Sequence, residues 1–195
     1  RLGLRLVKGL QQVAAERLMA ARAERVFEHI TDMARRATLD RGALKALSNA
    51  GALAALSSNR HQASWGALGV EPALPVFADA TIAEGIPMLH PLREGESIVA
   101  DYASLGLSLG RHPLALLRHS FDRKSCMTAV EISNCEHGTQ VNTAGLVISR
   151  QRPGTDTGVV FVTLEDETGV INLIVWSNLV ESQRRELLSS QLMGV

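Results

Sequence analysis

Residues 140–176 of this 195-residue chain read QVNTAGLVISRQRPGTDTGVVFVTLEDETGVINLIVW, and they predict three consecutive β-strands. The first strand, at residues 140–149, is rich in Val, Ile and Leu. Residues 159–165 alternate between two faces of a strand, one with Val160, Val162 and Leu164 and the other with Val159, Phe161 and Thr163. Residues 170–176 form an apolar run between turn residues. The stretch therefore predicts a β-meander.

The joints between these strands indicate how the chain turns. Residues 166–169 read DETG and predict a tight hairpin, in which we expect Gly169 to adopt a positive φ. The other joint, residues 150–158, is longer and basic at its start, and it contains one proline and two glycines. After the third strand, residues 178–190 predict a helix, and a new apolar strand starts at Leu192.

Three meander strands, a helix and a fourth strand follow the order of a five-stranded OB barrel. Residues 126–195 therefore predict an OB-fold domain that is incomplete, because only three strands and the start of a fourth are present. OB barrels bind single-stranded nucleic acid or oligosaccharide across the second and third strands.

Charge is distributed unevenly along a chain whose formal net charge is zero. Residues 1–60 hold 11 Lys and Arg against 5 Asp and Glu, whereas residues 61–110 hold 1 against 6. A basic front favours a polyanionic partner. A solvated helical surface would show the same charge, so this alternative stays open.

Residues 1–60 predict short helices joined by tight turns. A turn at Gly9 precedes helical periodicity that extends to residue 22. Thr31 or Asp32 is expected to cap a short helix, and Asp40 is expected to cap a helix over residues 41–49. A turn at Gly51 then leads to another short helix ending near residue 57. Two glycine-centred hairpins between short helices predict a tandem helix-hairpin-helix domain over residues 1–60.

Such hairpins can bind the phosphates of duplex DNA. Gly9 and Gly51 would let the backbone approach a phosphate closely, and the amides at the start of the next helix would face it. Lys8 would add a positive charge beside the first hairpin. The usual second glycine of the motif is replaced by Gln11, so an ordinary joint in a helical bundle is the alternative.

Residues 61–125 predict a proline-containing helical connector between the two domains. Residues 73–80 are expected to be irregular, and short helices are expected over residues 97–105 and 114–118. The overall prediction is an α+β multidomain chain.

The chain shows no metal-site pattern and no membrane span. Cys126, Cys135 and His137 lack a recognised zinc spacing and a fourth ligand, so reduced thiols in a cytoplasmic protein are expected. No apolar run reaches the ~18 residues of a transmembrane helix. Both ends of the chain read as cut from a longer polypeptide.

Three segments resemble one family in matching order. Residues 105–118, LGLSLGRHPLALLR, resemble a segment of bacterial C-family DNA polymerases. Residues 147–176 are similar to the OB domain that follows it there, and residues 6–22 and 39–56 are similar to the preceding tandem helix-hairpin-helix. The RQRPGT run at residues 150–155 is most similar to the error-prone paralogue of the replicative α subunit.

The resemblance implies that the chain is the DNA-binding C-terminal part of such an error-prone polymerase. It would position duplex and single-stranded template for damage-induced translesion synthesis. The family's catalytic palm would lie upstream of Arg1, so no catalytic residue and no cofactor is expected here, and Mg²⁺ is expected in the polymerase domain of the parent chain. Expected partners are DNA and other mutagenesis or replication proteins, such as a sliding clamp or an inactive translesion-polymerase-like protein.

Four residues of the predicted barrel are candidates for binding a single strand. Arg150 and Arg152 lie in the first loop, Phe161 lies on the second strand, and Trp176 ends the third. Phe161 could instead belong to the core, and Trp176 could cap the barrel end. Two other functions remain possible: a stand-alone nucleic-acid-binding adaptor, and an OB module that binds a protein.

Overall fold

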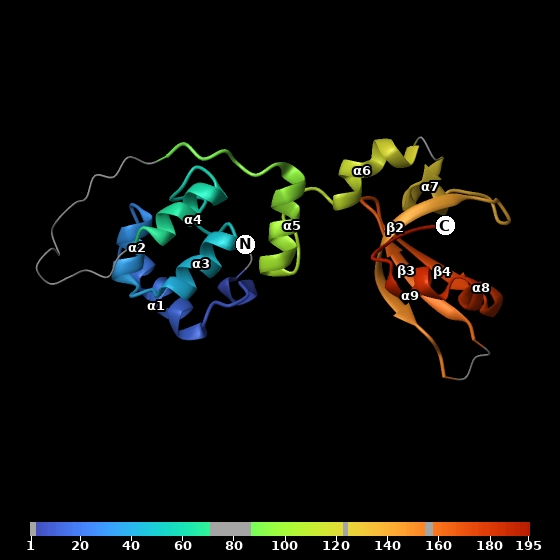
Figure 1. Cartoon of the computed structure of the whole chain (residues 1–195), viewed down its shortest axis with the longest axis horizontal. Coiled ribbons are helices and arrows are strands. Elements are labelled where there is room, and N and C mark those ends of the chain that lie inside the picture. Colours follow the sequence, from blue (N-terminus) through green and yellow to red (C-terminus); the bar gives the residue numbers. More distant parts are fainter. Residues whose placement is uncertain (1–2, 71–86, 123–124, 155–157) are drawn as a thin grey trace, which may run out of the picture. The chain divides into compact units, whose positions relative to one another are not determined.

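The computed structural model describes residues 3–70, 87–122, 125–154 and 158–195. The chain divides into two compact units, Arg1–Gly110 and Arg111–Val195 (Figure 1). The described parts of residues 61–125, which the sequence predicts as a connector, are shared between these units. The stretch predicted to be irregular, residues 73–80, lies outside the described residues.

The first unit is helical throughout its described regular structure. In chain order it contains η1 (Leu4–Leu6), α1 (Gln12–Glu24), α2 (Ile30–Arg36), α3 (Arg41–Asn49), α4 (Arg60–Leu68) and α5 (Glu94–Leu105). The helical front that the sequence predicts is thereby confirmed. None of the described helices is long and apolar enough to cross a membrane.

Side-chain caps define where the short helices begin. The predicted cap of α3 is confirmed, because Asp40 Oδ1 accepts a hydrogen bond from the first turn of α3 at 2.7 Å. The prediction for α2 was wrong, because the cap is His29 and not Thr31 or Asp32. His29 has an extended backbone, and its Nδ1 accepts a hydrogen bond from the Asp32 amide at 2.9 Å.

The short helix expected to end near residue 57 is absent, and residues 51–56 form turns instead. Gly51, at φ +65°, ends α3 in a Schellman motif, in which the Ala52 amide donates to the Leu47 carbonyl at 3.0 Å. The next helix begins only after Asn59, whose side chain accepts a hydrogen bond from the Gln62 amide at 2.9 Å.

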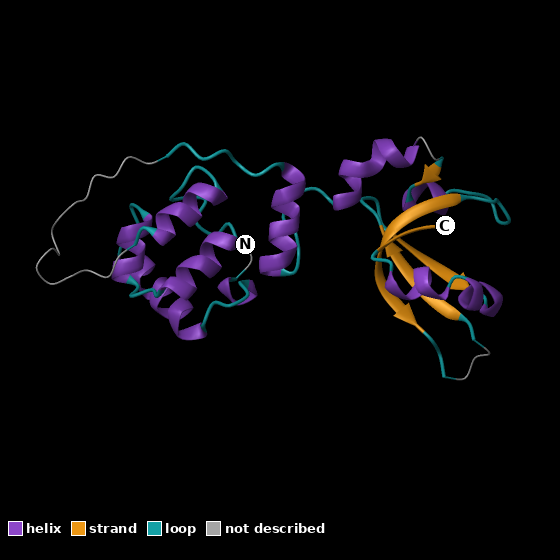
Figure 2. Cartoon of the chain, in the orientation of Figure 1, coloured by secondary structure: helices purple, strands orange, loops and turns teal. Residues whose placement is uncertain are grey.

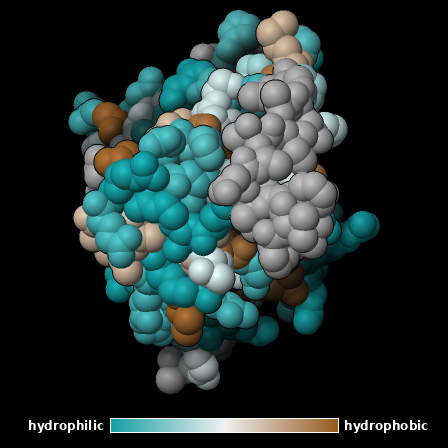
Figure 3. Space-filling model, turned by 90° about the vertical axis from the view of Figure 1, so that its left-hand side faces the viewer, coloured by the Kyte–Doolittle hydropathy of each residue, from teal (hydrophilic) through white to brown (hydrophobic). Residues whose placement is uncertain are grey.

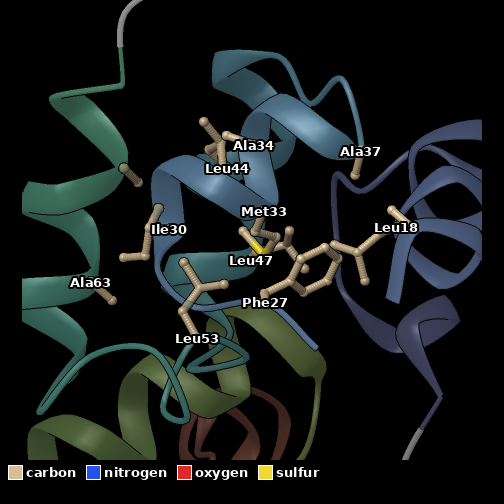
Figure 4. Close-up of a cluster of buried hydrophobic side chains, with 12 residues drawn as sticks. Leu18, Phe27, Ile30, Met33, Ala34, Ala37, Leu44, Leu47, Leu53 and Ala63 are labelled. Atoms are coloured by element: carbon tan, nitrogen blue, oxygen red, sulfur yellow. The ribbon is translucent and has the colours of Figure 1, made fainter. Parts of the chain in front are cut away.

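The core of the helical unit is formed where α1, α2, α3 and α4 meet (Figure 4). Phe27 lies at its centre beside Leu18 and Leu47, and Leu47 is 1% exposed. The Arg36 guanidinium lies over the Phe27 ring at 4.9 Å and covers it from solvent. Burial of these side chains stabilises the unit, because each fully buried large aliphatic or aromatic side chain contributes about 1.5–3 kcal/mol.

The second unit combines short helices with a sheet (Figure 2). Its elements are α6 (Pro113–Asp122), β1 (Cys126–Met127), α7 (Ala129–Ser133), β2 (Asn142–Gln151), β3 (Val160–Glu165), β4 (Val170–Val175), α8 (Ser177–Ser182), α9 (Arg184–Ser189) and β5 (Leu192–Gly194). The three meander strands and the fourth strand are confirmed. The predicted helix is present as two short helices that separate at Gln183.

The long strand β2 organises a mixed sheet of five strands among the described residues. Its beginning pairs with β1 in parallel and with β5 in antiparallel, and its second half pairs with β3. A β-bulge between Val147 and Ser149 bends β2 between the part that pairs with β5 and the part that pairs with β3. Among the described strands, β4 and β5 each pair on one side only, so the sheet is open. This confirms the α+β class and fits an incomplete barrel.

The alternation of β3 places its two faces as predicted. Val160, Val162 and Leu164 are at most 5% exposed, whereas Phe161 is 37% exposed. Leu187 of α9 packs against the buried face. The buried face is therefore the core of the unit, and the opposite face of β3 is open to solvent.

The hairpin between β3 and β4 forms, but the predicted role of Gly169 was wrong. Gly169 is not among the residues with positive φ. The turn is instead organised by Asp166, whose Oδ1 accepts hydrogen bonds from the amides of Thr168 at 2.7 Å and Gly169 at 3.0 Å. Because a buried carboxylate supplies these acceptors, the turn does not need left-handed backbone.

Candidate nucleic-acid interface

The first hairpin joins η1 to α1 and has the backbone geometry that the sequence predicts. Gly9 adopts φ +82°, which favours glycine. The N-cap of α1, Gln11, makes no side-chain hydrogen bond to the helix, and Gln11 and Gln12 are exposed. The first amides of a helix have no acceptor within it. The start of this 13-residue helix can therefore donate hydrogen bonds to an external acceptor.

Lys8, beside this hairpin, is tied to the end of α5. Its amide donates to the Ser104 carbonyl at 2.9 Å, and its Nζ donates to the Tyr102 carbonyl at 3.2 Å. A cation near the last carbonyls of a helix is favourable, because the helix dipole is negative there. Lys8 nevertheless remains exposed.

The guanidinium of Arg60, on α4, lies against the Gly51 turn and binds α5. Arg60 Nη2 lies 2.5 Å from Asp101 Oδ1, and Nη1 donates to the Ser97 carbonyl at 3.2 Å, both on α5. Lys8 and Arg60 also line one cleft of about 370 Å³ in the helical unit. The two basic residues beside the predicted hairpins therefore both anchor α5.

The structure contains a second tight turn between helices, which the search for glycine-centred hairpins did not predict. Helices α2 and α3 are joined by the short turn at residues 37–40, in which Thr38 has a positive φ of +49°. Thr38 is exposed, and the Leu39 amide donates back to the Ala34 carbonyl at 2.9 Å. The sequence did indicate this turn. A helix expected to end at Arg36 and a next helix capped by Asp40 are separated by only a few residues.

Basic side chains on the described surface of the helical unit are mostly exposed. They include Arg5, Lys8, Arg17, Arg22, Arg35, Arg41 and Lys45. Hydrophilic residues predominate on the face in Figure 3, and hydrophobic ones are scattered. A polyanion can therefore reach many of the cations that give residues 1–60 their positive charge.

Of the four single-strand candidates, Phe161 lies on the solvent-facing side of the sheet. Trp176 does not end the third strand as predicted, because β4 ends at Val175 and Trp176 is the N-cap of α8. Phe161 of β3 lies directly opposite Ile174 of β4, and Trp176 lies two residues beyond Ile174. Phe161 is 37% exposed and Trp176 is 62% exposed. Beside them, Thr163 Oγ1 donates to Asn172 Oδ1 at 3.0 Å. The face thus offers aromatic rings and hydrogen-bonding groups to solvent.

The two arginine candidates occupy different environments. Arg150 lies opposite Val162, on the core side of β2, and its Nε donates to the Leu187 carbonyl at 2.6 Å. Its Nη2 also donates to the Ser190 carbonyl, so Arg150 binds the C-terminal end of α9. Arg152 is exposed and forms no ion pair with a described carboxylate.

The carboxyl groups with shifted pKa values belong to structural networks. Burial of Asp166 raises its pKa, but hydrogen bonds from Thr168, Ala129 and Gly169 outweigh this effect and hold the pKa below its ordinary value. The hydrogen bonds from Arg118 likewise lower the pKa of Glu167. Arg118 Nε lies 2.5 Å from Glu167 Oε1, which joins α6 to the β3–β4 hairpin.

Comparison with known proteins finds a motif in the helical unit and relatives that match the whole chain. A family model described as a helix-hairpin-helix motif matches residues 1–63. The error-prone DNA polymerase of Alkalilimnicola ehrlichii is 55% identical over 195 residues, which are all of this chain and 19% of that protein. The error-prone DNA polymerases of Methylococcus capsulatus and Pseudomonas aeruginosa are 49% and 44% identical, again over the whole chain and 19% of each protein.

The matches cover the helical unit and the sheet unit together, and the chain spans about a fifth of the length of these relatives. The chain is therefore similar over its whole length to one segment of the error-prone DNA polymerases.

Proposed function

We propose that the chain is the DNA-handling segment of an error-prone DNA polymerase. The observation that carries the proposal is the match to error-prone DNA polymerases over the whole chain, together with the helix-hairpin-helix match at residues 1–63. In the longer protein, the segment serves DNA synthesis on damaged template.

The helical unit binds the phosphates of duplex DNA. Gly9 lets the backbone approach a phosphate, and the uncapped start of α1 supplies amide donors at the positive end of the helix dipole. The turn at residues 37–40 is a second contact, and the Gly51 turn is a third. Contacts of this kind hold the duplex without reading its sequence.

The sheet unit is an OB barrel that binds the single-stranded template. Phe161 and Trp176 present π faces to solvent on the β3–β4 side of the sheet, where bases can stack. Arg152 and the end of β2 supply positive charge beside them. Because only two aromatic rings are available for stacking, we expect weak binding of the single strand. We also expect this binding to depend strongly on salt, since much of it comes from charge.

The chemistry of the longer protein is nucleotidyl transfer with two Mg²⁺ ions outside this segment. The segment's own residues hold the substrate and do not react with it. Replication and mutagenesis proteins, such as a sliding clamp or an inactive translesion-polymerase-like protein, are its partners in the cytoplasm.

The duplex proposal is tested by fluorescence anisotropy with the full 195-residue chain and a labelled duplex. Lys8→Gln removes one charge at the first hairpin, and Arg22→Gln removes one at the far end of α1 as a matched control. We expect Lys8→Gln to reduce the salt slope of duplex binding by about 0.9 and Arg22→Gln to change it less. Equal slopes in all three proteins would show that the hairpin only packs the domain.

A protein-binding role for the sheet is the second candidate function. Ile174, opposite Phe161, and Val170, opposite Glu165, are 54% and 58% exposed, so this face of the β3–β4 hairpin also presents aliphatic side chains to solvent. Exposed apolar surface of this kind can mark a protein interface. Failure of wild-type chain to bind oligothymidine at low salt would favour this second role.

A further inference from the structure

A cleft of about 320 Å³ opens in the sheet unit between the end of β2, the start of β3 and the helices α8 and α9. Its lining includes Arg150, Arg152, Val160, Ser177, Val180 and Arg184. This volume lies at the small end of the ~300–1,000 Å³ range of ligand sites. The cleft therefore suits a unit the size of one nucleotide.

Three arginines give the cleft a positive character against one acid, Glu181. Arg152 and Arg184 are exposed, and neither forms an ion pair or a side-chain hydrogen bond with a described residue. Arg150 is held in place, because its guanidinium donates to the Leu187 and Ser190 carbonyls. The cleft is thus lined by Arg150, which is held in place, and by Arg152 and Arg184, which have no described side-chain partner.

The walls between these charges are apolar. Val160 is 5% exposed, Val180 packs against the sheet core, and Leu188 is 55% exposed. Gly158 lets the backbone pass close to α8 at one side of the cleft. It adopts φ +88°, and a Cβ there would lie 3.2 Å from Ser177 Cβ. The site therefore fits an anion that also carries an apolar or sugar portion.

Most of the cleft lies on the core side of the sheet, and one lining residue, Gln151, connects it to the solvent-facing side. Gln151 lines the cleft and lies directly opposite Phe161, which in turn lies opposite Ile174. In an extended single strand of nucleic acid, each base is linked through its sugar to phosphates that lie within about one nucleotide of it. A strand stacked on Phe161 can therefore place a neighbouring phosphate among the arginines.

We propose that this cleft binds a phosphodiester group of single-stranded nucleic acid, with Arg184 and Arg152 as its mobile cationic contacts and Arg150 as their fixed support. The inference rests on the proposed single-strand role of the sheet unit. It adds Arg184 and Ser177 of the helices to the binding surface, residues far from the β2–β3 loop in sequence.

The test compares Arg184→Gln with Arg185→Gln in the full 195-residue chain. Both changes remove one exposed charge from α9, but only Arg184 lines the cleft. In titrations of labelled oligothymidine of about 12 nucleotides, we expect Arg184→Gln to weaken binding about five- to tenfold. Its salt slope should fall by about 0.7. Arg185→Gln should bind as the wild type does.

Equal affinities of the two variants, with tight wild-type binding, would overturn the cleft site and leave the single-strand function standing. Failure of the wild type to bind oligothymidine would instead overturn the single-strand function itself. A titration with a glutamate oligopeptide tests whether the cleft binds an acidic protein segment instead of nucleic acid. Tighter, Arg184-dependent binding of that peptide than of oligothymidine would assign the cleft to an acidic protein segment and overturn the proposal.

Discussion

Arg60 Nη2 lies 2.8 Å from the position that a Cβ atom on Gly51 would occupy. The same guanidinium binds Asp101 and the Ser97 carbonyl of α5. Arg60 therefore joins the start of α4 to α5 and lies against the turn after α3, so a side chain at residue 51 would have to displace a guanidinium that is bound to α5.

Gly51→Ala is expected to lower the free energy of unfolding by about 1–3 kcal/mol, because it strains left-handed backbone and displaces Arg60. Urea denaturation of the full chain measures the change. Gly42→Ala is the matched control, since Gly42 lies in α3 without a positive φ and a Cβ there meets only the Asp40 carboxylate at 3.4 Å. It should raise stability by about 0.5–1 kcal/mol. Similar losses in both variants would contradict the steric explanation.

Asp166 is expected to make stability depend on pH. Its pKa is lowered in the folded protein, so its contribution is present above the unfolded pKa of about 3.9 and is lost as pH falls through the folded value. Asp166→Asn should therefore be less stable than wild type by about 1–3 kcal/mol at neutral pH. The difference should shrink below about pH 4.

Glu165→Gln provides the control for this prediction, because the Glu165 side chain makes no hydrogen bond to a described residue. Denaturation curves of the three proteins between acidic and neutral pH supply the measurement. A stability difference for Asp166→Asn that stays constant down to acidic pH would show that the charge of Asp166 is not the cause.

Arg150 and Arg152 are expected to separate into a structural and a binding role. Arg150→Ala removes the hydrogen bonds to the Leu187 and Ser190 carbonyls, so it should lower the unfolding free energy by about 1–3 kcal/mol. Arg152→Ala should change stability by less than about 0.5 kcal/mol, because its side chain is exposed. Thermal melting of both variants checks this, and equal melting temperatures would argue against a structural role for the hydrogen bonds from Arg150 to the end of α9.

Phe161→Leu is expected to distinguish stacking from packing. Leucine keeps an apolar neighbour for Ile174 but loses the π face, so oligothymidine binding should weaken by about 1–3 kcal/mol while the melting temperature stays near that of wild type. Fluorescence titration and thermal melting of the same samples provide both values. If affinity and melting temperature fall together, Phe161 belongs to the packing of the sheet and not to a binding surface.

Much of the local structure was predictable because its causes are local. The alternation at residues 159–165 separates Phe161 from the buried valines, and Asp40 caps α3 across only three residues. The helix expected to end near residue 57 is absent, and two further local predictions failed because a different side chain accepts the hydrogen bonds of the backbone amides. His29 caps α2 in place of Thr31 or Asp32, and Asp166 organises the hairpin so that Gly169 needs no special backbone.

The helical front, the three meander strands, the faces of β3 and the resemblance to error-prone DNA polymerases could be predicted from the sequence, since periodicity and turn chemistry act over a few residues. The helix α4, the strand β1 and the helix α7 were not predicted. Only the tertiary structure decided what the charged candidates do. Lys8 reaches a carbonyl 94 residues away, and Arg150 reaches one 37 residues away. These hydrogen-bond partners depend on which elements pack together, because a long flexible side chain can donate to any acceptor that the fold places within about 3 Å of it.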